Sequence, residues 1–333
     1  MPSQPPKPMH SDDPVADISL YLAPELAGVE RTLREILDSE SDLIREVGKY
    51  ICLTNGKKLR PIITLLVAKA FGAAGVVPVS VAAAMEAVHV ATLLHDDVID
   101  KATMRRGKPS VNHRWGDDVA ILMADYLYAS AFELSLEYLD KEPLRLICQV
   151  TRKMCEGEMF QIEQRGNWLA PDDYIEIITR KTAFLFSACS AVGGMAARLA
   201  PEAITGTTGF GLDFGLAFQI TDDALDFTAH SEQWGKVVGI DVLTGKQTLP
   251  LILALKEATP EERRRIETVL DTGQEPAFIV DIIERHGAIE QALEIARGYA
   301  RQSMSQLDGH EIHDREAYEY LLSLPEYVVA RQY

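Results

Sequence analysis

The chain has 333 residues, 47% of them hydrophobic, and a formal net charge of −17 at pH 7. This hydrophobic share is that of a folded globular protein and excludes a disordered chain. The negative charge and the lack of any Lys/Arg-rich run argue against nucleic acid as a partner.

Residues 1–14, at the start of the chain, are rich in Pro and Ser and lack the basic-then-apolar pattern of a signal peptide. They are expected to form a loose tail in front of one domain that spans residues 15–333. No uninterrupted apolar run reaches membrane-spanning length, since the run Pro61–Ala68 stops at Lys69. We therefore expect a cytoplasmic protein without a transmembrane segment.

The rest of the chain is dominated by apolar residues at helical spacing. This spacing predicts helices over Val15–Ser39, Leu59–Phe71, Pro78–Asp100, Asp117–Leu139, Leu144–Arg165, Asp172–Gly193 and Glu202–Thr228, followed by shorter ones. Strand-type alternation between turn pairs is missing, so the predicted fold class is all-α. Ala82–Leu94 and Ser187–Ala200 are apolar on most of their surface, which places them in the centre of a helical bundle.

Two acidic clusters of identical spacing stand at the ends of long apolar helices: Asp96, Asp97 and Asp100, and then Asp222, Asp223 and Asp226. In each cluster the first and last carboxylates lie one turn apart on one helix face. Carboxylates this close repel each other unless a cation intervenes, and at a helix C-terminus they oppose the macrodipole. A single acidic cluster is as often a solvated surface, but the matched pair in apolar sequence favours magnesium, which binds carboxylates and phosphate oxygens.

Cations gather near these clusters. Lys57 and Arg60 stand at a predicted helix N-terminus, where a basic pair is misplaced unless it binds an anion. The other basic residues near the clusters are Arg105 and Arg106 after the first, and Lys236 and Lys246 after the second. Each basic pair by itself would be explained as ordinary charged residues on the protein surface. Their repeated position beside carboxylates points to a diphosphate that magnesium bridges and Lys and Arg clamp.

Four further polar residues lie within apolar helices. His89 precedes Asp96 by seven residues and Gln219 precedes Asp222 by three, so each shares a face with a cluster. Such a histidine is more often a hydrogen-bonded core residue than a ligand. Lys181, followed by Thr182, lies in an apolar helix where an unpaired ammonium is costly, which favours a role beside a bound anion.

These motifs, with Gly56–Pro61, Met104–Pro109, Lys181–Ala183 and Phe218–Gln219 in this order, resemble the trans-isoprenyl diphosphate synthases. They are most similar to the bacterial long-chain, octaprenyl-type members, from about residue 40 to the closing Tyr327–Arg331 stretch. The resemblance implies the isoprenoid synthase fold, a single large helical bundle around a central cavity, and a homodimer. Asn55 stands where the family has a glycine, and Lys58 where arginine is common.

The resemblance also implies a role for each residue. Several Mg²⁺ ions per active site would be held by Asp96, Asp97, Asp100, Asp222, Asp223 and Asp226. The allylic substrate would be contacted by Arg105, Lys181, Thr182, Gln219, Lys236 and Lys246, residues that would take part in catalysis with the aspartates. Isopentenyl diphosphate would be bound by Lys57, Arg60, His89 and Arg106.

The implied reaction is a Mg-assisted ionisation, condensation and elimination. It would extend farnesyl or geranylgeranyl diphosphate with isopentenyl diphosphate to a long all-trans polyprenyl diphosphate. Alternatives are a short-chain farnesyl or geranylgeranyl diphosphate synthase, a terpene cyclase, or a non-catalytic subunit of a two-component synthase. The residues for a second diphosphate argue against a cyclase, and the six retained carboxylates argue against an inactive subunit.

Product length depends on the residues that line the path of the growing chain. A helical wheel places Val88 and Thr92 nearest the line from Asp96. The resemblance points instead to Ala91, the fifth position before the first aspartate, where short-chain synthases tend to carry an aromatic ring. None of the three is large, so a product of about heptaprenyl to decaprenyl length is expected by that resemblance, with Phe132 either as a deeper wall or as ordinary core packing.

Overall fold

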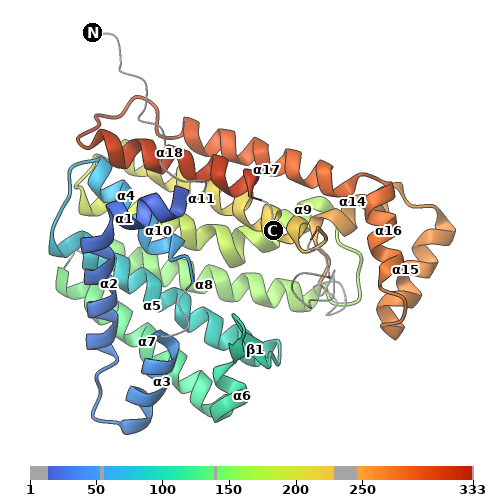
Figure 1. Cartoon of the computed structure of the whole chain (residues 1–333), viewed down its shortest axis with the longest axis horizontal. Helices are drawn as coiled ribbons and strands as arrows, with labels where there is room; N and C mark the ends of the chain where they lie inside the picture. The colour runs from blue at the N-terminus through green and yellow to red at the C-terminus, as the bar shows by residue number, and fades with distance from the viewer. Residues whose placement is uncertain (1–13, 53–55, 139–140, 229–245, 332–333) are drawn as a thin grey trace. The chain divides into compact units, whose positions relative to one another are not determined.

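A computed structural model describes residues 14–52, 56–138, 141–228 and 246–331 (Figure 1). The helices are α1 (Pro14–Tyr21), α2 (Ala23–Ile36), α3 (Asp42–Cys52), α4 (Leu59–Ala70), α5 (Val76–Ile99), α6 (Val111–Trp115), α7 (Asp117–Tyr138), α8 (Lys141–Glu163), α9 (Pro171–Ile178), a π-helical turn η1 (Thr179–Ala183), α10 (Phe184–Ala196), α11 (Pro201–Leu225), α14 (Leu249–Glu257), α15 (Pro260–Thr272), α16 (Ala277–Arg285), α17 (Ala288–Ser305) and α18 (Arg315–Ala330). In the described residues, strand structure is limited to the hairpin β1 (Met104–Arg105) and β2 (Lys108–Pro109). The all-α prediction is confirmed.

The chain divides into two compact units that interleave along the sequence. Unit 1 comprises Met1–Thr151, Leu185–Thr208 and Gly309–Leu324, and unit 2 comprises Arg152–Phe184, Gly209–Asp308 and Pro325–Tyr333. The single domain over residues 15–333 stays a prediction. Most of the predicted tail, residues 1–13, lies outside the described residues.

The core of unit 1 is built on α5, which packs along α7 and against α4 and α2 (Figure 1). Its middle is a run of fully buried small residues from Ala82 to Ala84, continued by Ala87 and Ala91. Such small side chains let neighbouring helices approach closely while still removing apolar surface from water. The predicted central position of the Ala82–Leu94 segment is confirmed, apart from half-buried Val90 and Leu93.

Helix α10 is the second apolar helix, and it is buried in unit 1 from Leu185 to Gly194. Its Gly193 lies directly against α4, because a Cβ at that position would be 2.6 Å from the carbonyl oxygen of Thr64. The Thr64 hydroxyl donates a hydrogen bond to the Cys189 carbonyl at 3.0 Å. This contact satisfies a polar group that burial would otherwise penalise.

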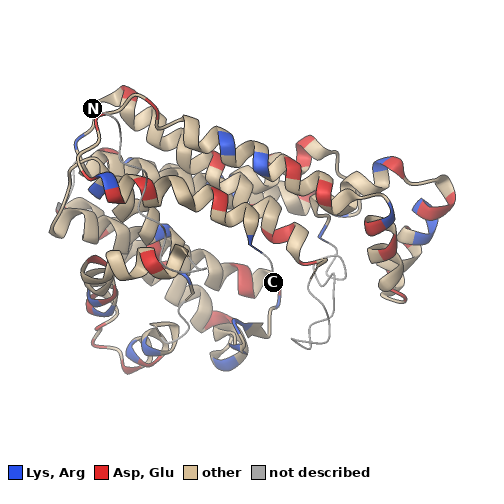
Figure 2. Cartoon of the chain, turned by 45° about the horizontal axis from the view of Figure 1, so that its top comes forward, with Lys and Arg blue, Asp and Glu red and all other residues tan. Residues whose placement is uncertain are grey.

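The core of unit 2 joins α9, η1, α11, α14 and α17. Its buried members include Tyr174, Ile178, Ile220 and Ala296. A second apolar cluster joins α14, α15 and α16 around Ile266 and Ile282. The exposed faces of α15 and α16 carry acidic and basic residues interspersed (Figure 2).

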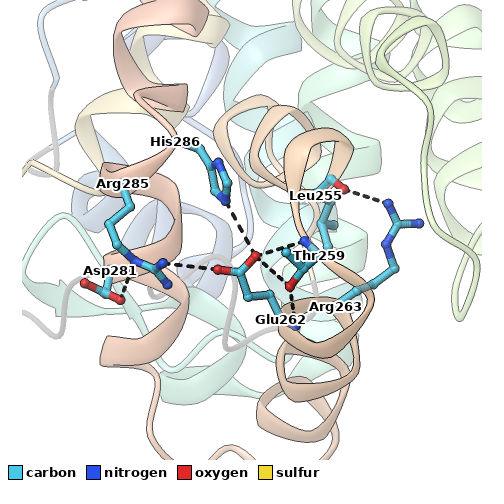
Figure 3. A network of polar contacts seen from close by, with 7 residues as sticks. All are labelled: Leu255, Thr259, Glu262, Arg263, Asp281, Arg285 and His286. Carbon is cyan, nitrogen blue, oxygen red and sulfur yellow. Dashed lines mark hydrogen bonds and ion pairs between the residues drawn. The ribbon is translucent and has the colours of Figure 1, made fainter.

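A polar network ties the start of α15 to the end of α16 (Figure 3). The Thr259 hydroxyl accepts the backbone N–H of Glu262 at 3.2 Å, and the Glu262 carboxylate accepts the backbone N–H of Thr259 at 2.9 Å. This reciprocal capping box satisfies two helix-end donors. The same carboxylate accepts a hydrogen bond from Arg285 at 3.1 Å. Hydrogen bonds from the backbone and the hydroxyl of Thr259 lower the pKa of Glu262 below its usual range, and Arg285 contributes a smaller lowering.

Three segments differ from the sequence-based expectation. The predicted helix Val15–Ser39 is interrupted at Leu22, and α2 then begins with Pro24 in its first turn. The predicted helix Asp172–Gly193 contains the π-helical turn η1, which periodicity cannot distinguish from regular helix. The segment between the predicted helices Pro78–Asp100 and Asp117–Leu139 contains the β-hairpin and α6. Arg106 and Gly107 both have positive φ at its tip, as a tight two-residue turn requires.

Helices α5 and α7 are long and apolar enough to cross a membrane by length and composition alone. In α5, 72% of the apolar window is buried within the protein, and in α7 39%. The buried core helix of a folded protein passes the same test. These two helices are therefore weak evidence for a membrane span.

Candidate active site

The three aspartates of the first acidic cluster differ in how far they are buried. Asp97 is only 3% exposed, Asp96 is half-buried and Asp100 is exposed at the end of α5. Oxygen Oδ1 of Asp97 accepts a hydrogen bond from Nε of Arg105 at 2.9 Å and pairs with its Nη2. The middle aspartate thus holds Arg105, the residue of β1 that directly precedes the turn of the β-hairpin.

In the second cluster, at the end of α11, the middle aspartate is again the most buried. Asp223 is 8% exposed, whereas Asp222 and Asp226 are half-buried. One oxygen of Asp223 accepts from the Tyr174 hydroxyl at 2.6 Å, and the other accepts from the Gln219 amide at 2.8 Å. Asp222 forms an ion pair with Arg331 at 3.0 Å.

The outer aspartates are the donors that fit a magnesium ion. Asp96 and Asp100, and likewise Asp222 and Asp226, are one turn apart on the less buried side of their helices. Within the described residues, no three His, Cys, Asp or Glu side chains gather into a complete metal cage. Magnesium binds through one or two carboxylates and completes its shell with water and phosphate oxygens, so an outer pair suits it. Metal contact by any of the six aspartates stays a prediction.

Arg60, in the first turn of α4, is held by two side chains from elsewhere in unit 1. Its guanidinium lies 4.4 Å from the centre of the Phe186 ring, and its Nη1 is 3.1 Å from Nε2 of His89. Burial, and then the positive charges of Arg60, Arg106 and Arg105, keeps the pKa of His89 well below its ordinary value. A neutral His89 accepts from Arg60 and orients it.

The loop before α4 packs against the hairpin loop. A Cβ at Gly56 would lie 2.7 Å from Cζ of Arg106, so a larger residue there would displace the end of the Arg106 side chain. Lys57 follows on the exposed side. Lys58 instead pairs with Glu30 of α2 and has a left-handed backbone conformation at the start of α4. Arg60 and Arg106 thus both lie close to His89 in unit 1, whereas Lys58 has a structural partner in Glu30.

Sequence reasoning missed Glu86, which is 8% exposed in the middle of α5. It lines a cavity of about 70 Å³ together with Asp97, Arg105 and Arg106. Burial raises the pKa of Glu86, although Arg60, Arg106 and Lys58 oppose this shift. A carboxylate inside the apolar Ala82–Leu94 segment was the signal that could have found it.

Unit 2 contains four of the residues predicted for the allylic diphosphate, Lys181, Thr182, Gln219 and Lys246, whereas Arg105 belongs to unit 1. Lys181 and Thr182 lie in η1, and π-helical turns are often found at functional sites. The Thr182 hydroxyl donates to the Gln219 carbonyl at 2.9 Å, and Gln219 in turn donates to Asp223. Tyr174 joins this network of hydrogen bonds because its hydroxyl also donates to Asp223. No spacing rule pointed to Tyr174, because its partner Asp223 is 49 residues away.

The remaining predicted residues are distributed as follows. Lys246 is half-buried just before α14, and Lys236 lies outside the described residues. Val88 and Ala91 are fully buried, and the Thr92 hydroxyl donates to the His89 carbonyl at 2.7 Å. Phe132 is half-buried on α7, with its ring centre 6.2 Å from that of Tyr128.

The fold and the two sets of carboxylates and cations define a helical enzyme of diphosphate chemistry. The sequence model of the polyprenyl synthetase family matches residues 41–284, and the chain belongs to this family. It is 36% identical to octaprenyl diphosphate synthase of Escherichia coli over 272 residues, which cover 81% of this chain and 84% of that protein. It is 34% identical to a short chain isoprenyl diphosphate synthase of Methanothermobacter thermautotrophicus, over 91% of this chain and 95% of the relative.

A solved structure has the same fold. The polyprenyl synthase of Caulobacter crescentus, in complex with calcium and isoprenyl diphosphate, matches with a TM-score of 0.89 and 33% identity over 98% of this chain and 100% of that one. The isoprenoid synthase fold is thus confirmed. The chain is a trans-prenyltransferase, as the resemblance implied, and its relatives include both long-chain and short-chain synthases.

Proposed function

We propose that the chain adds isopentenyl diphosphate to farnesyl or geranylgeranyl diphosphate and forms a long all-trans polyprenyl diphosphate. The observation that carries this proposal is the presence of two separate cation sets. One, in unit 1, holds Arg60 against His89. The other, in unit 2, includes Lys181, which lies next to the hydroxyl of Thr182 in one π-helical turn. A condensing enzyme must bind two diphosphates, whereas a cyclase binds one.

In this proposal, isopentenyl diphosphate binds to the unit 1 set. Arg60 is restrained by the Phe186 ring and by His89, so little conformational freedom is lost when it binds an anion. Lys57 and Arg106 add positive charge from the adjoining loops. His89 acts by orienting Arg60, because a neutral imidazole adds no positive charge. The allylic diphosphate binds to Lys181, Thr182, Gln219 and Lys246, with Arg105 and Lys236 as further proposed contacts.

The outer aspartates Asp96, Asp100, Asp222 and Asp226 are proposed to hold magnesium against the allylic diphosphate. Bound magnesium would act as a Lewis acid that stabilises the charge of the departing diphosphate. Lys181 contributes to the same end by placing an ammonium beside the leaving group. The relative from Caulobacter crescentus, whose structure is complexed with calcium and isoprenyl diphosphate, supports the use of a divalent cation.

Assay of the purified chain alone tests the activity. With farnesyl diphosphate, isopentenyl diphosphate and magnesium, we expect condensation products longer than geranylgeranyl diphosphate. A cyclic hydrocarbon would indicate a cyclase, and no product without a partner protein would indicate a subunit of a two-component enzyme. A product that ends at geranylgeranyl diphosphate, with excess isopentenyl diphosphate, would refute the long-chain assignment.

Replacing Ala91 with Phe is expected to shorten the product to farnesyl or geranylgeranyl diphosphate. Ala91 is 0% exposed on α5, five residues before Asp96, so a ring there would fill space on the proposed path of the chain. The diphosphate-binding residues are left intact, so condensation should continue. Chromatography against prenol standards measures the product, and the thermal melting of the variant shows whether it is folded. An unchanged product would show that Ala91 is not part of the wall.

A homodimer in the cytoplasm is proposed as the working form. Helix α7 carries Leu122 at 67% and Leu136 at 57% exposure, large apolar side chains that a second copy would cover. Leu122→Glu is expected to convert the dimer to monomer, because burial of an unpaired carboxylate in an apolar interface is unfavourable. Light scattering during gel filtration measures this, with Leu20→Glu as a control at an exposed leucine of α1. A wild-type chain that elutes as a monomer at all concentrations would exclude the dimer.

A further inference from the structure

Lys181 is held by two polar side chains from α8 that have no assigned role. Its Nζ donates to Oε1 of Gln161 at 2.6 Å and lies 2.5 Å from Oε2 of Glu158. Glu158 and Gln161 are three residues apart and therefore share one face of α8. The side chains of Lys181 and Glu158 are only 24% and 15% exposed, so this pair is better shielded from water than a surface ion pair.

Gly157 allows α8 to come this close to η1. A Cβ at Gly157 would lie 2.6 Å from Cβ of Arg180, 3.2 Å from Cγ of Lys181 and 3.3 Å from the Lys181 backbone nitrogen. Two of these atoms belong to the backbone or lie next to it, so they cannot move aside without a shift of the helix. Any larger residue at position 157 must push η1 away from α8.

The π-helical turn η1 also determines which helix Lys181 contacts. The extra residue in such a turn changes the direction of the side chains that follow, relative to a regular helix. In η1 it places Lys181 toward α8, while its neighbour Thr182 bonds to Gln219 of α11. The two residues thus bind to different helices of unit 2.

We propose that Gly157, Glu158 and Gln161 form a seat that fixes the ammonium of Lys181 for the allylic diphosphate. The proposal rests on the assignment of Lys181 to that substrate. An ammonium has three donors, and the seat takes two of them. One donor is left for a phosphate oxygen, in a fixed direction. Glu158 and Gln161 are positioning residues, which act on the substrate through Lys181.

Leucine substitutions at the two polar positions test the seat. Glu158→Leu and Gln161→Leu are each expected to lower kcat/KM for farnesyl diphosphate about tenfold, as expected for one lost hydrogen bond to a charged group. The KM for isopentenyl diphosphate should stay within about twofold of wild type, because Lys181 serves the other substrate. Glu158→Gln keeps an acceptor oxygen and should recover most of the loss. Glu156→Gln is the matched control, since Glu156 pairs with Lys153 on the same helix.

Gly157→Ala tests the close approach. It is expected to lower kcat/KM for farnesyl diphosphate more than either leucine variant does, since it displaces Lys181 as a whole. Calorimetric binding of farnesyl thiolodiphosphate, an unreactive analogue, should weaken in parallel. Thermal melting reports whether each variant is folded. If Gly157→Ala does not fold, the two leucine variants decide the question alone.

The outcomes separate the seat from the assignment on which it rests. If Lys181→Ala leaves use of farnesyl diphosphate unchanged, the assignment of Lys181 is wrong and the seat has no function. If Lys181→Ala impairs it but the folded leucine variants behave like wild type, the seat is refuted. Equal losses for both substrates would also refute it, because they indicate a general structural effect. A selective loss for the allylic substrate, recovered in Glu158→Gln, supports it.

Discussion

Replacing Asp96 or Asp222 with Ala is expected to lower turnover by about a thousandfold or more, the effect of removing groups that stabilise a leaving group. Thermal stability should stay nearly unchanged or rise. Each of these aspartates has further carboxylates within one turn of its helix, and their mutual repulsion is relieved when one is removed. Steady-state rates at saturating magnesium and thermal melting measure the two effects.

The control for this experiment is Glu202→Ala. Glu202 is an exposed acidic residue in the first turn of α11, the helix that ends in Asp222. Its loss changes the net charge by the same amount but should leave turnover as in wild type. Near-normal turnover in Asp96→Ala or Asp222→Ala would remove that cluster from the mechanism. A loss of turnover that follows a loss of folded protein would assign the aspartate a structural role.

Arg60→Ala is expected to raise the KM for isopentenyl diphosphate by about a hundredfold, the effect of losing a hydrogen-bonded charge at a partly buried anion site. Arg60 is positioned in unit 1 by His89 and Phe186, and none of these residues belongs to the aspartate clusters. The KM for the allylic substrate should therefore change little. Initial rates with one substrate varied and the other saturating separate the two constants.

Lys181→Ala is the reciprocal variant, and it should mainly impair use of the allylic substrate. Lys181 lies in unit 2 and contacts Glu158 and Gln161. If Arg60→Ala and Lys181→Ala weakened the same substrate to the same extent, the assignment of separate diphosphate sites would be wrong. Arg180→Ala is the control next to Lys181. Arg180 pairs with Glu176 on its own helical segment, so it should leave both constants unchanged.

Much of the protein could be predicted from the sequence because the signals are local. Apolar residues at helical spacing predicted an all-α chain and the central position of the alanine-rich part of α5. The repeated aspartate spacing predicted two carboxylate pairs at helix ends, because residues four apart always share a helix face. The cations beside these pairs pointed to diphosphate chemistry. These inferences need no knowledge of how the helices pack.

Only the tertiary structure decided which side chains meet across helices. Six aspartates of equal standing in the sequence separate into buried Asp97 and Asp223, which accept hydrogen bonds from Arg105 and Tyr174, and four less buried ones. Four residues were missed because each lies beside a residue that another part of the chain supplies: Glu86, Tyr174, Glu158 and Gln161. Helical spacing tells which residues share a face. It does not tell what that face packs against, because this depends on the close fit of side chains that are far apart in the sequence.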